Sequence, residues 1–69
     1  MYDLAACQEW NRLFAQGQED AAKAYGRQGV EIVKAARGRV RLAAQDRANA
    51  YALGTFAYLT DRLYALGAL

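Results

Sequence analysis

Histidine and proline are absent from this 69-residue chain, and cysteine occurs once. Cys7 has no second thiol to pair with, and without histidine the usual ligand set of a zinc or copper site is missing. Histidine is also the commonest general acid and base, and the paired carboxylates Glu19 and Asp20 diverge on a helix. Gly26 and Gly29 lack the other residues of a phosphate-binding loop. We therefore expect no metal, no cofactor and no enzymatic activity.

Long apolar runs are also scarce. The longest uncharged stretch, residues 48–60, has thirteen residues, whereas a membrane-spanning helix needs about 20 predominantly apolar ones. The N-terminus lacks the basic segment and apolar run of a secretory signal peptide. These features predict a cytoplasmic protein without a membrane span.

Neither sign of charge is in large excess. Nine Lys and Arg residues stand against seven Asp and Glu residues, a net charge of +2, which is too small to indicate nucleic-acid binding by itself. A chain of this size buries only about 60% of the surface of its unfolded form. Small folds are commonly reinforced by disulfides, metals or self-association. Since the first two are excluded, self-association remains, and we expect a homodimer or a higher oligomer.

Helix-forming residues are abundant, with sixteen alanines and no proline to interrupt them. Asp3 suits a helix N-cap, and apolar residues follow it at steps of three and four: Ala6, Cys7, Trp10, Leu13, Phe14, Ala21, Ala24 and Tyr25. This pattern predicts one helix over about 3–25, with Trp10 and Phe14 facing a core. The helix would run through Gly17, whose missing side chain would let a neighbour approach closely.

Gly26 and Gly29 form the densest group of helix breakers, and they predict a turn at 26–29. A second helix would then run from about 30 to 66. At 1.5 Å per residue it would be roughly 55 Å long, against roughly 35 Å for the first. The first helix is too short to cover it.

We therefore predict a single all-α domain over 1–69, a helical hairpin with a short first and a long second helix. Two such hairpins would assemble as a homodimeric helical bundle. A bend of the second helix near 46–49 is compatible with the pattern. A three-helix arrangement with breaks at Gly17 and Gly38 is the alternative.

Small residues recur at every seventh position, at Ala15, Ala22, Gly29, Ala36, Ala43, Ala50 and Ala57. A heptad repeat favours left-handed supercoiling, and small side chains let helix axes pack closely. An alanine-rich chain also produces such a series by coincidence. Interpreted as a packing seam, it predicts a self-association surface made of Ala36, Ala43, Ala50, Leu53, Phe56, Ala57 and Leu63.

Two polar surfaces could bind a partner. Aromatic and arginine side chains, which are enriched at binding hot spots, predict a protein-binding surface at Tyr51, Thr55, Tyr58 and Arg62. Packing of these tyrosines at a dimer seam is the alternative. The cations Lys34, Arg37, Arg39 and Arg41 are clustered, which is typical of a surface that binds an anionic partner such as nucleic acid. An ordinary solvent-exposed helix face is the alternative.

The leading hypothesis for function is binding without catalysis. The chain would bind another protein and modulate it, most simply by inhibiting it. Phages and mobile elements encode small proteins of this kind, which act as inhibitors or anti-activators of host regulatory proteins. A nucleic-acid-binding helical regulator that uses the basic cluster is the alternative. A structural subunit of a larger helical assembly is the second alternative.

Overall fold

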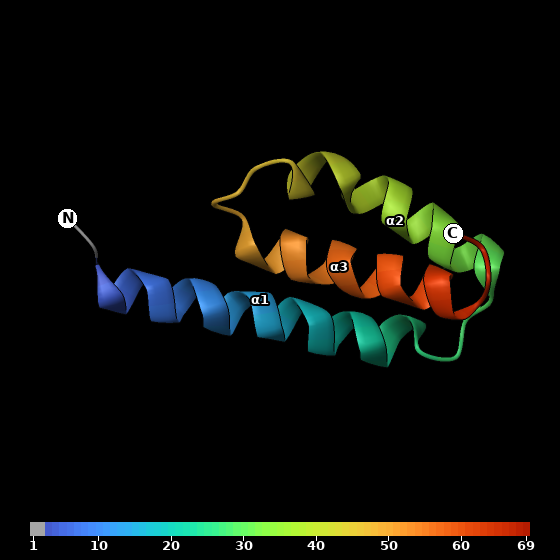
Figure 1. Ribbon diagram of the computed structural model, residues 1–69, viewed down its shortest axis with the longest axis horizontal. Helices are drawn as coiled ribbons and strands as arrows, with labels where there is room; N and C mark the ends of the chain where they lie inside the picture. Colours follow the sequence, from blue (N-terminus) through green and yellow to red (C-terminus); the bar gives the residue numbers. More distant parts are fainter. Residues whose placement is uncertain (1–2) are drawn as a thin grey trace.

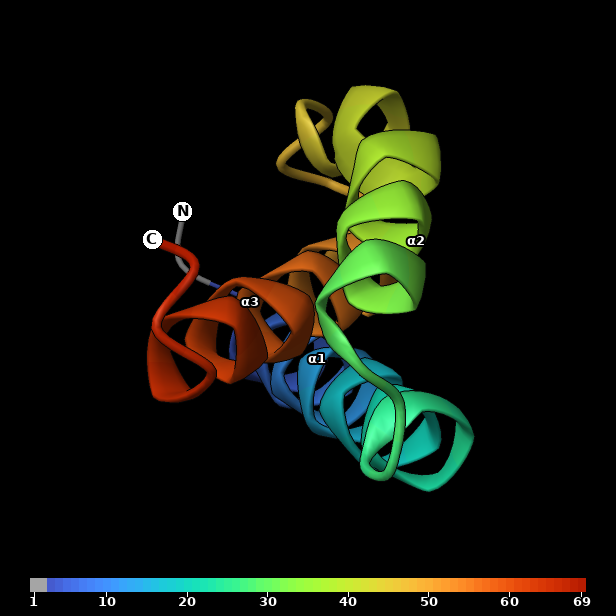
Figure 2. The same cartoon turned by 90° about the vertical axis from the view of Figure 1, so that its right-hand side faces the viewer.

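Three helices lie within residues 3–69, the part of the chain that this computed structural model describes (Figure 1). Helix α1 spans Leu4–Tyr25, α2 spans Val30–Ala44 and α3 spans Ala50–Ala65. The described residues contain no strand, so the all-α prediction is confirmed for them. Both α1 and α2 pack on α3 and have little contact with each other. Seen end-on, they lie on two sides of α3 and leave a third side uncovered (Figure 2).

The ends of α1 follow local sequence signals. The Asp3 carboxylate accepts a hydrogen bond from the Ala6 amide at 3.2 Å, so the predicted N-cap is confirmed. The chain leaves the helix after Tyr25 and begins α2 after Gly29, whose backbone is extended. The turn between α1 and α2 thus occupies 26–29, where the glycine pair indicates it.

The prediction of one long second helix is wrong, because α2 ends at Ala44 and α3 begins at Ala50. Two short polar side chains account for the break. The Asp46 carboxylate accepts from the Ala48 amide at 3.0 Å, and the Asn49 side chain caps α3 by accepting from the Ala52 amide at 3.1 Å. Such side chains satisfy backbone amides outside a helix and so compete with helical hydrogen bonds.

The predicted breaks at Gly17 and Gly38 are also wrong, although the alternative's count of three helices is right for the described residues. Gly17 lies inside α1 and Gly38 lies inside α2. A glycine within a helix costs about 1 kcal/mol relative to alanine. This cost is small enough for helix on both sides to continue through it.

The close approach predicted at Gly17 is confirmed and is matched by a second glycine on α3. A Cβ atom added to Gly17 would collide with the backbone carbonyl of Tyr51. A Cβ added to Gly54 would collide with the carbonyl of Phe14 and lie 3.2 Å from the Gln18 amide nitrogen. The backbones of α1 and α3 therefore touch where they cross, an approach that larger residues would prevent.

The main buried cluster lies between α2 and α3 and consists of Val33, Ala36, Leu59 and Leu63. Ala68 packs against it because α3 ends in a left-handed Gly67, with φ of 74°, that turns the chain back. The Ala68 amide then donates to the Leu63 carbonyl at 2.9 Å. Among the described residues, five of the eight buried apolar ones are alanine, so this core holds few large side chains.

Trp10 joins α1 to the turn between α2 and α3. Its indole Nε1 donates to the Arg47 carbonyl at 2.9 Å, and its ring stacks on Phe14 with the centroids 5.3 Å apart. Both rings are half-buried. They therefore cover one end of the α1–α3 contact rather than fill the core.

We predict that Gly54→Ala destabilises the fold by about 2–3 kcal/mol, because its Cβ can be accommodated only by moving α1 away from α3. Gly38→Ala is the matched control, since a Cβ there meets nothing within 4 Å. It should stabilise the chain by about 0.5–1 kcal/mol through better helix propensity. Urea unfolding followed by circular dichroism at one protein concentration measures both, and equal effects of the two substitutions would contradict the close contact.

Candidate functional site

The described residues present surfaces rather than a cavity. No pocket is found in the part of the chain from residue 3 to 69. Within the same range, no three His, Cys, Asp or Glu side chains come close enough together to hold a metal ion. None of α1, α2 and α3 is both long and apolar enough to cross a membrane. The surfaces considered below are the exposed faces of the three helices.

The predicted protein-binding residues Tyr51, Thr55, Tyr58 and Arg62 are brought together, but they face α1 and the 26–29 turn. The Thr55 hydroxyl donates to the Gly17 carbonyl at 3.3 Å. An Arg62 guanidinium nitrogen donates to the Gln28 carbonyl at 3.5 Å, and Tyr58 packs against the buried cluster. Much of this surface is thus occupied within the chain.

Tyr51 lies at the exposed edge of this contact and binds a carboxylate on α1. Its hydroxyl donates to Asp20, which also accepts from the Gln16 amide at 2.8 Å. The hydrogen bond from Tyr51 holds the pKa of Asp20 below its usual range, and the Gln16 amide acts in the same direction. The same bond raises the pKa of Tyr51, because a phenolate would lie beside the carboxylate.

The residues of the predicted self-association surface are divided among different environments. Ala36, Ala50 and Leu63 are buried inside the chain. The Phe56 ring lies under the Arg37 guanidinium, whose carbon is 4.5 Å from the ring centroid. Ala43 is exposed on α2, while Leu53 and Ala57 are half-buried on α3.

Leu53 and Ala57 of that set lie on the uncovered side of α3. The helical spacing places Leu53, Ala57 and Tyr64 on one stripe, between the residues that face α1 and those that face α2. Tyr64 is 63% exposed, and Asp61 lies at the edge of the stripe. We call Leu53, Ala57, Asp61 and Tyr64 the open face of α3.

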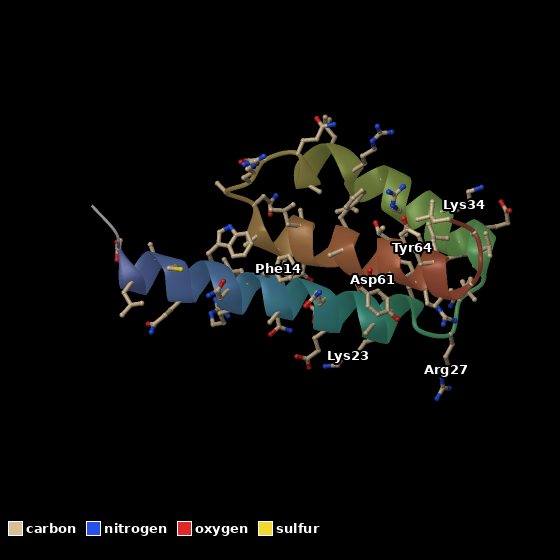
Figure 3. All side chains as sticks on the ribbon, viewed as in Figure 1. Phe14, Lys23, Arg27, Lys34, Asp61 and Tyr64 are labelled. Atoms are coloured by element: carbon tan, nitrogen blue, oxygen red, sulfur yellow. The ribbon has the colours of Figure 1, made fainter. Side chains whose placement is uncertain are left out.

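The predicted basic cluster is only partly available to an anionic partner. Arg37 is half-buried, because it stacks on Phe56 and its Nε donates to the Thr60 hydroxyl at 2.8 Å. Lys34, Arg39 and Arg41 are exposed. Lys34 projects from α2 away from α3 (Figure 3).

The side of α2 that points away from α3 is an apolar surface that the sequence analysis missed. Leu42 is 77% exposed and lies opposite the buried residues of α2 by helical spacing. Ile32 is 49% exposed and lies at the edge of the buried side, one turn before Ala36. We call the exposed residues Ile32, Ala35, Gly38, Arg39 and Leu42 the outer face of α2. The signal was present as apolar residues at 32, 35 and 42. It was lost because residues of α2 and α3 were placed on one continuous helix.

Comparison of the chain with protein-family models, curated proteins and solved structures gives no significant match. Functional inference therefore depends on the chain's own surfaces. Two of them carry exposed large apolar side chains: the outer face of α2, with Ile32 and Leu42, and the open face of α3, with Tyr64.

We predict that Tyr51→Phe removes a pH-dependent part of the stability at both extremes. The pKa of Asp20 is lowered on folding, so the ionised carboxylate stabilises the folded state. This stabilisation is fully present above the usual carboxyl pKa of about 4 and is lost as pH falls through the lowered pKa. Because the pKa of Tyr51 is raised, its contribution is present below about 10 and is lost as pH rises through the raised value.

Urea midpoints from about pH 3 to about pH 11 measure this difference between the wild type and Tyr51→Phe. The difference should be largest near neutral pH and shrink toward both ends. Tyr64→Phe is the control, because the exposed Tyr64 hydroxyl makes no hydrogen bond to a carboxylate among the described residues. A pH-independent difference for Tyr51→Phe would rule out the coupling to Asp20.

Proposed function

We propose that this chain is a non-enzymatic protein-interaction module that forms a homodimer and modulates a partner protein by covering part of it. The observation that carries the proposal is apolar surface left without a partner. The accessible surface is 4852 Å², against roughly 4,300 Å² for a typical folded monomer of this mass. The large side chains that are fully buried in the described residues are Leu59, Leu63 and Val33. Such a fold gains stability by association.

The open face of α3 suits a second copy of the chain. Its stripe of Leu53, Ala57 and Tyr64 is uncharged, and Asp61 lies at the edge, so two copies can meet without opposing like charges at the centre. The small Ala57 in the middle allows the two helices to approach closely. In this arrangement α2 stays outside the dimer contact.

The outer face of α2 suits a different molecule. Two copies meeting there would bring Arg39 and its neighbouring cations together, which disfavours pairing of like with like. Exposed Ile32 and Leu42 supply apolar anchors for a protein partner. A partner held there would be unable to use the covered surface elsewhere, and on this basis we propose an inhibitory role, which we place in the cytoplasm.

Nucleic-acid binding is the second candidate, and the charge distribution favours it. Residues 30–49 contain five of the nine Lys and Arg residues of the chain and two of its seven Asp and Glu residues. Against it stands the position of Ile32 and Leu42, since phosphate contacts would leave these apolar side chains uncovered.

We predict a dimer of the 7.6 kDa chain that Tyr64→Glu dissociates, because a charge placed in an apolar contact loses its hydration. Ala65→Glu is the matched control: it introduces the same charge at the next residue, which is exposed on another side of α3. Size-exclusion chromatography with light scattering at about 100 µM and about 1 µM distinguishes the states.

Helicity by circular dichroism shows whether each variant is folded. A monomeric wild type would refute the dimer, and a dimer that survives Tyr64→Glu would move the contact away from the open face of α3. Species much larger than a dimer would favour the structural-subunit alternative.

A further inference from the structure

We propose that the two copies of the dimer meet with their α3 helices parallel, and that Asp61 of each copy forms an ion pair with Arg37 of the other. This inference deepens the proposed function and depends on the dimer contact at the open face of α3. It follows from the positions of the charged groups at the two edges of that face.

The guanidinium of Arg37 marks the edge of the open face that adjoins α2. It lies over the Phe56 ring, 4.5 Å from the centroid, and its Nε donates to the Thr60 hydroxyl at 2.8 Å. By helical spacing, Thr60 lies beside Leu53 and Tyr64 on the side toward α2. The charged end of Arg37 therefore lies on α3 itself, about midway between Leu53 and Tyr64 along the helix.

The carboxylate of Asp61 marks the opposite edge, toward α1. By helical spacing, Asp61 lies between Ala57 of the stripe and Gly54, which contacts α1. Its side chain is exposed. The uncharged stripe of the open face is thus flanked by a base on one side and an acid on the other.

Neither group has a counter-charge within the chain. The ion pairs found among residues 3–69 both lie on α1. On α2 the neighbours of Arg37 one turn away on either side are the cations Lys34 and Arg41. Asp61 has no Lys or Arg three or four residues away. A half-buried guanidinium without a counter-charge is stabilised by an acidic partner, which a second copy can supply.

An antiparallel arrangement of the two α3 helices would oppose like charges. Its two-fold axis crosses the helices, so the α2 edges of the two copies would face each other. Because Arg37 lies about midway along the stripe, the two Arg37 side chains would meet. Lys34 and Arg41 would add to the repulsion, since both lie on the same side of α2 as Arg37. Like charges opposed across an interface disfavour this arrangement.

A parallel arrangement brings opposite charges together instead. Its two-fold axis runs along the helices, so the α1 edge of each copy faces the α2 edge of the other. Asp61 then lies within about three residues, or about 4.5 Å, of the height of Arg37 of the second copy. Two such pairs form, one on each side of the stripe. Charge complementarity therefore selects a second copy, in this orientation, as the occupant of the open face.

Disulfide cross-linking distinguishes the two orientations. Leu53→Cys and Tyr64→Cys are made separately in a Cys7→Ser chain, so that each variant carries one thiol. The two positions are about 16 Å apart along α3, and a disulfide needs Cα atoms within about 7 Å. Parallel helices therefore link each position to its own counterpart, whereas antiparallel helices link one position to the other.

The variants are mixed in equal amounts under reducing conditions and then oxidised, and mass spectrometry identifies the linked species. We expect both self-linked products and no product that joins the two variants. Leu42→Cys in the same background is the control, because Leu42 is exposed on the outer face of α2. It should link at least about tenfold more slowly. Helicity by circular dichroism shows that each variant is folded.

Exchange of the charges tests the ion pair itself. Asp61→Arg and Arg37→Glu should each raise the dimer dissociation constant about tenfold, because each opposes like charges at both edges. The double variant restores both pairs with the signs reversed and should return within about threefold of the wild type. Sedimentation measures the constants at about 50 and about 500 mM NaCl, and the effect of each single substitution should shrink at the higher salt.

The matched controls for charge are Glu31→Arg and Arg39→Glu. They make the same changes of charge at exposed positions of α2 that lie away from the open face of α3. Both should dimerise as the wild type does.

Results against this inference are distinguishable from results against the dimer. A product that joins only Leu53→Cys to Tyr64→Cys would refute the parallel orientation and retain a dimer on the open face. Weaker dimers in both charge variants without rescue in the double variant would refute the ion pair. A dimer with no cross-link at either position would refute contact along α3, and a monomeric wild type would refute the proposed function as well.

Discussion

The backbone contact between α1 and α3 at Gly17 and Gly54 determines the rest of the structure. Each glycine faces the carbonyl of the opposite helix, so neither position accepts a side chain while the helices stay at this distance. The contact directs Thr55 and Tyr51 toward α1, where they bind Gly17 and Asp20. It also leaves α2 to pack on another side of α3, and hence with an uncovered outer face (Figure 2).

An alanine-rich interior explains why association is the natural role of such a chain. Alanine favours helix strongly, but each buried alanine removes little apolar surface from water. The large side chains that could enlarge the core instead lie outside it, with Leu42 and Tyr64 exposed on different helices. The same composition that makes the three helices thus leaves faces that a second copy and a partner would cover.

Local features were predictable from the sequence, and long-range ones were not. The Asp3 cap and the close approach at Gly17 follow from residue chemistry within one helix. A bend near 46–49 was compatible with the sequence pattern, but the full break at 45–49, where Asp46 and Asn49 capture backbone amides, was not predicted. When 30–66 is treated as one helix, the exposed sides of α2 and α3 cannot be told from the sides that pack within the chain. For this reason Tyr58 was assigned to a partner-binding surface and the exposed Ile32 was overlooked.

The most direct test of this account is whether the α1–α3 contact lies within one chain. Nuclear Overhauser contacts from the Gly17 α-protons to Tyr51 and Thr55 can be sorted in a sample mixed from isotope-labelled and unlabelled chains. The structure predicts contacts within labelled chains and none between labelled and unlabelled ones. Contacts between chains would place these residues at a subunit seam, and would contradict the α1–α3 contact within one chain from which the exposed faces of α2 and α3 are derived.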